Sequence, residues 1–237
     1  MSATTSSWSA PPLIPGPWKD IPPADGLALA IRIGAAMQEQ GEGPGVWITE
    51  LQRLRTLPLK IYVNWLLGEA EVQLPDGNCG LANFLYGPGR RFVLLDHVSQ
   101  TLHRLNEHEL VPLRSEALVA EYVRFYLCHS ASNARRFQIV ESPEQLTYAD
   151  GVPREQLPPA VADIRPLRVS PIALVRNVYT ATVAAFVLYG ETLYRAQYLV
   201  NGDAVQMTDE QPLCKLPVRA ELLTGPLRIL ENRRYGE

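Results

Sequence analysis

Residues 178–208 carry the clearest pattern of apolar and polar positions in the chain. Three runs rich in Val, Tyr, Thr and Leu are separated by the dipeptides Gly190-Glu191 and Asn201-Gly202. Asn-Gly favours a tight hairpin, because both central residues of a type I′ turn need a positive φ. The segment therefore predicts a three-stranded antiparallel meander with turns at these two dipeptides. Such a meander excludes an all-helical protein and argues against a doubly wound parallel sheet.

Two segments have the period of a helix. Between residues 116 and 129, apolar side chains form a broad stripe, and Ser115 precedes them as a candidate N-cap. Glu116 in the first turn suits the positive end of the helix dipole. A second helical pattern covers residues 26–40 and ends at the glycine-rich segment 41–45.

Shorter apolar runs predict further strands, and they cover residues 81–86, 91–96, 137–140 and 167–169. Residues 101–106 are expected to pair back with 91–96. Residues 49–55 favour a short helix, whereas alternation between 61 and 74 favours a hairpin that ends at the turn 74–78. Residues 222–230 could form a last short strand or helix.

Together these elements predict an α+β fold. Curved antiparallel sheet, including the meander at about 178–208, is expected to pack on one long helix at about 115–129. Residues 26–237 are expected to form a single α+β domain, and the proline- and charge-rich connection 141–163 is the one candidate for an internal boundary.

Residues 1–25 are rich in Ser and Pro, which predicts an extended or flexible N-terminal arm. Trp8 and Trp18 are unusual in such a segment. They could pin the arm onto the domain or onto a second subunit. A homodimer joined through the N-terminal arm is therefore one hypothesis.

Composition and charge narrow the function. A formal net charge of −3 argues against nucleic acid as a partner, since nucleic-acid binding usually needs a basic domain. Three cysteines without a Cys-x-x-Cys pair form no disulfide framework and suit a reducing compartment. No signal peptide begins the chain, and the longest apolar run, residues 183–189, is too short to span a membrane. We therefore expect a cytoplasmic protein with no membrane partner.

Candidate catalytic groups are few. His97, His103 and His108 lie near Asp96, but their spacing fits no common metal motif, so no metal and no cofactor is predicted. Cys128 and His129 are adjacent on the expected helix and point about 100° apart, so they cannot contact each other. The sequence contains no nucleophile elbow, no P-loop and no dinucleotide-binding fingerprint.

Other polar and aromatic positions suit recognition. By the period of a strand, Tyr194 and Tyr198 share one face of the meander. The acidic pair Asp209-Glu210 could bind a cation or a basic partner. The basic pairs 90–91, 135–136 and 233–234 could form one patch for an acidic partner, although such pairs also protect sheet edges.

These observations favour a non-enzymatic cytosolic binding or interaction protein. It would bind a protein or a small-molecule ligand through the sheet face around Tyr194 and Tyr198, or through a concavity beside helix 115–129. The alternative is a small-molecule enzyme whose pocket, between the long helix and the curved sheet, contains His103, Asp96 and tyrosines. A third hypothesis is a self-associating structural protein that exchanges its N-terminal arm.

Overall fold

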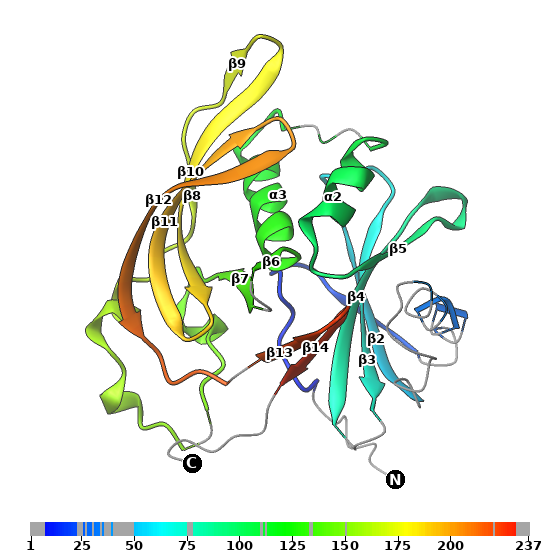
Figure 1. Ribbon diagram of the computed structural model, residues 1–237, viewed down its shortest axis with the longest axis horizontal. Coiled ribbons are helices and arrows are strands. Elements are labelled where there is room, and N and C mark those ends of the chain that lie inside the picture. The colour runs from blue at the N-terminus through cyan, green and yellow to red at the C-terminus, as the bar shows by residue number, and fades with distance from the viewer. Residues whose placement is uncertain are drawn as a thin grey trace.

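Two antiparallel sheets dominate the protein, and both are open (Figure 1). In this computed structural model the described residues are 8–22, 50–74, 78–109, 111, 113–132, 135–149, 151–219 and 221–230, with several helical positions between 26 and 39. Helices α2, Ser99–Asn106, and α3, Glu116–Cys128, lie between the two sheets in Figure 1. The predicted α+β class with antiparallel sheets is confirmed.

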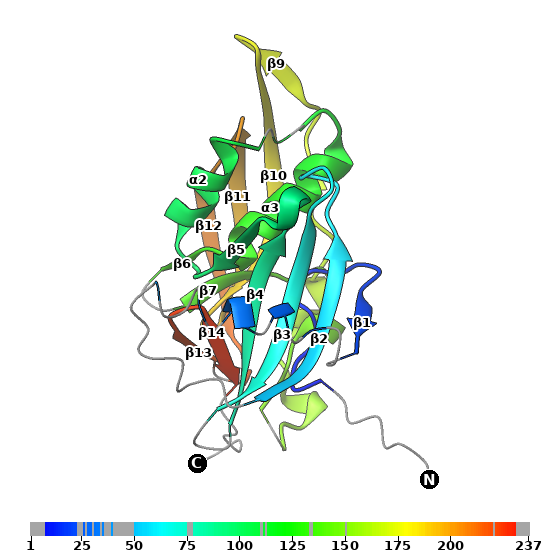
Figure 2. The same ribbon diagram turned by 90° about the vertical axis from the view of Figure 1, so that its right-hand side faces the viewer.

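The first sheet combines the two ends of the chain. Its strand order is β1-β2-β3-β4-β14-β13, and β5 pairs with β4. The strands are β1 Lys19–Ile21, β2 Glu50–Pro58, β3 Leu66–Gln73, β4 Cys79–Tyr86, β5 Phe92–Leu95, β13 Glu221–Thr224 and β14 Leu227–Leu230. Figure 2 shows β2, β3 and β4 side by side at the front of the molecule. The C-terminal hairpin β13–β14 therefore completes a sheet that the N-terminal half begins.

The second sheet contains the predicted meander. Its order is β12-β11-β10-β7-β6, and the short strands β8 and β9 also pair with β10. The strands are β6 Ala131–Ser132, β7 Arg135–Ile139, β8 Arg168–Val169, β9 Ala173–Val175, β10 Val178–Tyr189, β11 Thr192–Asn201 and β12 Ala204–Lys215. Three 3-10 turns, Pro143–Gln145, Arg154–Gln156 and Pro159–Asp163, occupy the connection from β7 to β8.

The meander differs from its prediction in length and in turn type. Its third strand, β12, runs to Lys215 instead of ending near 208. The second turn is centred on Gly202-Asp203, and Asn201 pairs with Ala204 as the last residue of β11. Only Gly202 has a positive φ there (61°), which is typical of a type II′ turn and not of type I′. The Asn-Gly signal thus located the hairpin but placed its centre one residue early.

Three other predictions of local structure are wrong. Residues 50–55 belong to strand β2, and residue 49 lies outside the described residues. Residues 101–106 belong to helix α2, and residues 60–65 form bends and a turn before β3 begins. The sequence of β3 alternates as predicted, but the strand is buried on both faces, so its polar positions Glu69 and Glu71 are buried as well. The described positions of the predicted helix 26–40 are helical, and the remaining positions lie outside the described residues.

Helix α3 begins where its sequence predicts. The hydroxyl of Ser115 accepts a hydrogen bond from the Leu118 backbone N–H at 3.3 Å, which satisfies one of the free donors of the first turn. Tyr122 and Phe125 of α3 are fully buried in the core cluster that also holds Val183 of β10 and Trp65. This cluster contains residues from both sheets, so α3 contributes to a core common to them.

Residues 8–22, the described part of the predicted N-terminal arm, pack on their own chain, and the rest of that arm lies outside the described residues. Leu13 and Ile14 are buried in the main core cluster. The guanidinium of Arg55 lies over the rings of Trp8 and Trp18, at 4.0 and 5.4 Å from their centres. Each ring also donates a hydrogen bond within the arm, Trp8 to Asp20 and Trp18 to the Ile14 carbonyl. Both tryptophans therefore contact the body of the same molecule.

In the part of the chain that is described, no helix combines the length and the apolar character needed to cross a bilayer.

Candidate ligand-binding pocket on the meander

A cavity of about 200 Å³ opens on one face of the second sheet. Its walls are mainly aromatic and apolar, with one carboxylate. The lining side chains come from β7, β10, β11 and β12, and they are Phe137, Val187, Tyr189, Tyr194, Ala196, Tyr198, Met207 and Glu210. Both tyrosines that the sequence singled out, Tyr194 and Tyr198, therefore meet in one pocket.

Strand register explains this convergence. Val187 pairs with Tyr194 and Val183 pairs with Tyr198, so both tyrosines follow the inner, odd-numbered face of β10. At the edge of β10 away from β11, Tyr189 pairs with Phe137 of β7. The rings of Tyr189 and Phe137 stack with centres 4.7 Å apart and an angle of 16° between their planes. The stacked pair forms an aromatic wall at the end of the pocket.

A bulge in β12 brings Glu210 into the pocket. Met207 pairs with Tyr198, and Asp209 pairs with Gln197, the residue that precedes Tyr198 in β11. Thr208 is therefore an extra residue in β12. The Thr208 hydroxyl donates to the Gln197 carbonyl at 3.2 Å. Beyond the bulge, Glu210 pairs with Ala196 and shares the pocket face, whereas Asp209 lies on the opposite face.

The hydroxyl of Tyr198 is the buried polar group of the pocket. The side chain is only 1% exposed, and within the described residues its hydroxyl oxygen has no hydrogen-bond partner. Burial raises the pKa of Tyr198, and the nearby Glu210 carboxylate raises it further. Tyr198 therefore remains a neutral phenol that can accept or donate one hydrogen bond to a ligand.

The pocket is electrostatically suited to a positive charge. Its aromatic faces are the negative ends of ring quadrupoles, and Glu210 adds a full negative charge. None of the described residues that line it is Lys, Arg or His. A cation can thus approach the rings and the carboxylate without meeting a fixed positive charge.

His103 and Asp96 lie elsewhere in the described structure. His103, on α2, has its Nε2 atom 3.4 Å from the Tyr126 hydroxyl of α3. Asp96 accepts hydrogen bonds from the Val98 backbone N–H and the Thr101 hydroxyl, both at 3.1 Å, and so holds the turn that leads into α2. Neither residue is among the described residues that line the pocket.

The remaining histidines and the helix cysteine are separated from the pocket. His97 is buried with a φ of 60°, and His108 is exposed. The Cys128 thiol donates to the Leu13 carbonyl at 3.5 Å, and burial raises its pKa. Among the residues that the structure describes, no group of three or more His, Cys, Asp or Glu side chains could hold a metal ion.

Sequence reasoning missed Phe137, Tyr189 and Met207 as pocket residues. Tyr189 and Met207 lie on meander strands, where alternation alone puts them on the face of Tyr194 or Tyr198 once the bulge is known. Phe137 reaches the pocket only because β7 pairs with β10 across about 50 residues of sequence, and no local pattern reports that pairing.

Comparison with protein-family models, with curated proteins and with solved structures finds no match to this chain. The fold and the pocket therefore define its class directly. It is an α+β protein of two open antiparallel sheets, with an aromatic, acid-containing pocket on the second.

Proposed function

We propose that the protein is a binding protein for a small organic cation, an ammonium compound that occupies the meander pocket. The observation that carries this proposal is the presence of four aromatic rings, the Glu210 carboxylate and the partnerless Tyr198 hydroxyl in one cavity. In this proposal the meander is a curved sheet packed on α3, and the pocket lies on the same inner face.

Each group has a role in recognition. An ammonium ion over aromatic faces gains about 0.5–2 kcal/mol, depending on how far it is desolvated. The Glu210 carboxylate compensates the charge, and the Tyr198 oxygen accepts an N–H hydrogen bond. The cavity of about 200 Å³ is smaller than the pockets of roughly 300–1,000 Å³ that bury drug-sized ligands. It fits a small amine, or the amine head of a longer molecule.

The enzymatic alternative is less well supported. That hypothesis places His103 and Asp96 in the pocket as acid–base groups, and acid–base catalysis needs such groups within hydrogen-bond reach of the substrate. Both residues have other neighbours, Tyr126 for His103 and the start of α2 for Asp96. Rings, one carboxylate and one phenol are sufficient for binding, and binding is what we propose.

Calorimetric titration with butylammonium, tetramethylammonium and the neutral analogue butanol tests this function. We expect both cations to bind and butylammonium to bind more tightly, because it alone can donate an N–H to Tyr198. Tyr194→Ala should weaken binding about tenfold by removing one cation–π wall. Glu210→Gln should weaken it about fivefold or more.

Asp209→Asn is the matched control for Glu210→Gln. The two residues are adjacent and exposed and lie on opposite faces of β12, and the bulge puts Glu210 on the pocket face. We expect Asp209→Asn to leave the affinity unchanged. Equal binding of butanol and butylammonium, or equal effects of the two carboxylate variants, would contradict the proposal.

A further inference from the structure

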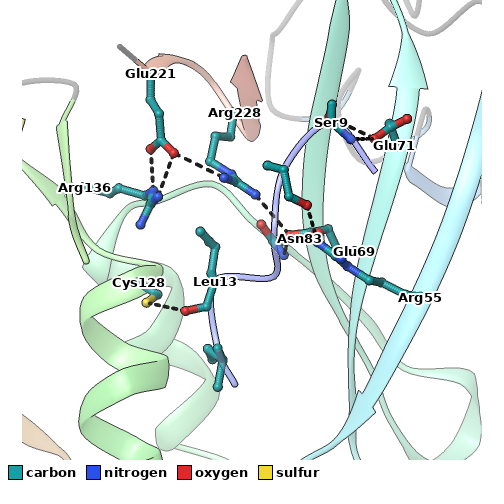
Figure 3. Close-up of polar contacts among 12 residues, drawn as sticks. Ser9, Leu13, Arg55, Glu69, Glu71, Asn83, Cys128, Arg136, Glu221 and Arg228 are labelled. Carbon is teal, nitrogen blue, oxygen red and sulfur yellow. Dashed lines mark hydrogen bonds and ion pairs between the residues drawn. The ribbon is translucent and has the colours of Figure 1, made fainter. Parts of the chain in front are cut away.

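A ladder of buried and partly buried charges joins the two sheets (Figure 3). Arg136 of β7 donates two hydrogen bonds to Glu221 of β13, at 2.6 and 2.7 Å. Glu221 also pairs with Arg228 of β14 at 3.2 Å, and Arg228 in turn contacts Glu69 of β3 at 3.3 Å. Glu69 pairs with Arg55 of β2 at the far end. Charged side chains therefore cross the junction between the sheets without interruption.

The ladder has more positive than negative charge. It contains three arginines, all at most 6% exposed, and two glutamates. Burial acts to raise the pKa of Glu221, but Arg136 and Arg228 outweigh it and lower that pKa to about 2, so the carboxylate is ionised. One positive charge is therefore uncompensated within the ladder. A buried charge without a counterion is costly, which favours binding of an anion.

Donor groups remain available beside this excess charge. Within the described residues, Arg136 Nη1 and Arg228 Nε are buried and have no hydrogen-bond partner. Both side chains line a cavity of about 140 Å³, whose other walls include Arg135, Arg219 and Thr147. That volume is several times the roughly 30 Å³ that one water molecule occupies in the liquid. The cavity is therefore large enough for a small polyatomic anion.

The charge of the cavity wall identifies the class of anion. Four arginines and two glutamates, Glu191 and Glu221, line the described part of the cavity, and a third glutamate, Glu69, pairs with Arg228 from outside it, so arginines outnumber carboxylates at this site. Phosphate carries about −1.5 to −2 at neutral pH, and guanidinium groups bind its oxygens in pairs. We propose that this arginine cavity is a binding site for phosphate or for the phosphate group of a small molecule.

This site is separate from the meander pocket. Arg136, Gln138 and Leu188 line the arginine cavity, whereas the alternate residues Phe137, Val187 and Tyr189 line the meander pocket. The two sites therefore occupy opposite faces of β7 and β10. The phosphate proposal does not depend on the ammonium proposal, and each can fail alone.

Titration of the full chain with inorganic phosphate, followed by calorimetry and by the shift of the thermal midpoint, tests the site. We expect saturable binding that sulfate competes for and that potassium chloride at equal ionic strength does not reproduce. Arg135→Gln, at the exposed rim, should weaken phosphate binding at least threefold. Arg168→Gln removes the same charge from an exposed position on β8 outside the cavity and should change nothing.

Arg136→Lys examines the buried part of the site. Lysine keeps the positive charge but loses the two-pronged donor geometry. We expect a variant that folds and binds phosphate at least tenfold more weakly. If it does not fold, the comparison of Arg135→Gln with Arg168→Gln tests the site by itself. No saturable binding to the wild type, or equal losses in Arg135→Gln and Arg168→Gln, would overturn the proposal.

Discussion

The meander pocket and the arginine cavity share strands β7 and β10 but are built in opposite ways. All walls of the meander pocket come from the second sheet, and most of them lie within residues 187–210. The arginine cavity takes its walls from the N-terminal arm, from β7, from the β10–β11 turn and from the C-terminal hairpin. A pocket made by neighbouring strands depends on alternation, whereas a pocket made by distant segments depends on charges that hold those segments together.

The largest expected effect on stability comes from Glu69→Gln in the charge ladder. Glu69 is fully buried, contacts Arg55 and Arg228, and accepts a hydrogen bond from Asn83 at 3.3 Å. The substitution leaves the buried Arg55 without the carboxylate it pairs with and leaves Arg228 with Glu221 alone, so we expect a loss of about 3–5 kcal/mol in the free energy of unfolding. Urea denaturation measures it. Glu191→Gln, at the exposed rim, should change stability by less than about 0.5 kcal/mol.

Acid should lower the free energy of unfolding through two buried histidines, His97 and His129, that lie near the charges of Arg136 and Arg228. Burial, and then the charges of His129, Arg136 and Arg228, lower the pKa of His97 to about 3. Burial is also the main cause that lowers the pKa of His129, to about 4. The unfolded chain binds these protons near pH 6.5, so the stability is fully present above that pH and is lost as the pH falls toward 4. We expect a loss on the order of 3 kcal/mol per histidine.

His97→Asn separates this effect from general acid denaturation. Asparagine tolerates the positive φ of position 97 and does not titrate. The loss of stability between pH 7 and 4.5, followed by urea denaturation, should then fall to about half. His108→Asn, at an exposed position, is the control and should leave the pH profile as it is. A wild-type stability that is flat across this range would contradict the assignment.

On the aromatic side we expect a substitution with two opposite effects. Tyr198→Phe removes a buried hydroxyl that has no partner among the described residues, so stability should rise by about 1 kcal/mol. The same change should weaken butylammonium binding about fivefold, while tetramethylammonium, which has no N–H, should bind as before. Tyr62→Phe is the control, because the Tyr62 hydroxyl donates to Asn106 at 2.6 Å and its loss should destabilise. Destabilisation by Tyr198→Phe would show that the hydroxyl is bonded.

The smallest expected effect concerns the arm at the end of the ladder. Trp8→Ala removes the ring 4.0 Å from the Arg55 guanidinium, and we expect a loss of about 1 kcal/mol. Trp8→Phe keeps a ring and should lose less. A sizing column run on the same variant tests the homodimer hypothesis, because a dimer joined through the arm would shift toward the monomer.

The sequence predicted what local patterns encode. The meander, helix α3 and its Ser115 cap follow from alternation, helical period and a capping residue, and the sharing of one pocket by Tyr194 and Tyr198 follows from strand period. Alternation also indicated a strand where β3 lies, but it could not show that Glu69 and Glu71 of that strand are buried. Local patterns failed at residues 101–106, where a short helix of mixed composition resembled a strand.

The arginine cavity could not be predicted in this way. Arg135-Arg136 was noted as a basic pair, but Glu221, the partner of Arg136, and Arg228, which shares that carboxylate, are more than 80 residues away. In a sequence, a buried arginine looks the same as a solvent-exposed one. Only the pairing of the C-terminal hairpin with β4 brings the charges together.

The bulge at Thr208 also bears on how the pocket tolerates insertions and deletions during evolution. If β12 paired regularly beyond Met207, the residue opposite Ala196 would be Asp209 in place of Glu210. Because both neighbours are acidic, a carboxylate would face the aromatic rings in either register. A shift of register by one residue normally replaces an inward side chain with an outward one. Here it would keep a carboxylate in the pocket, on a side chain shorter by one methylene group.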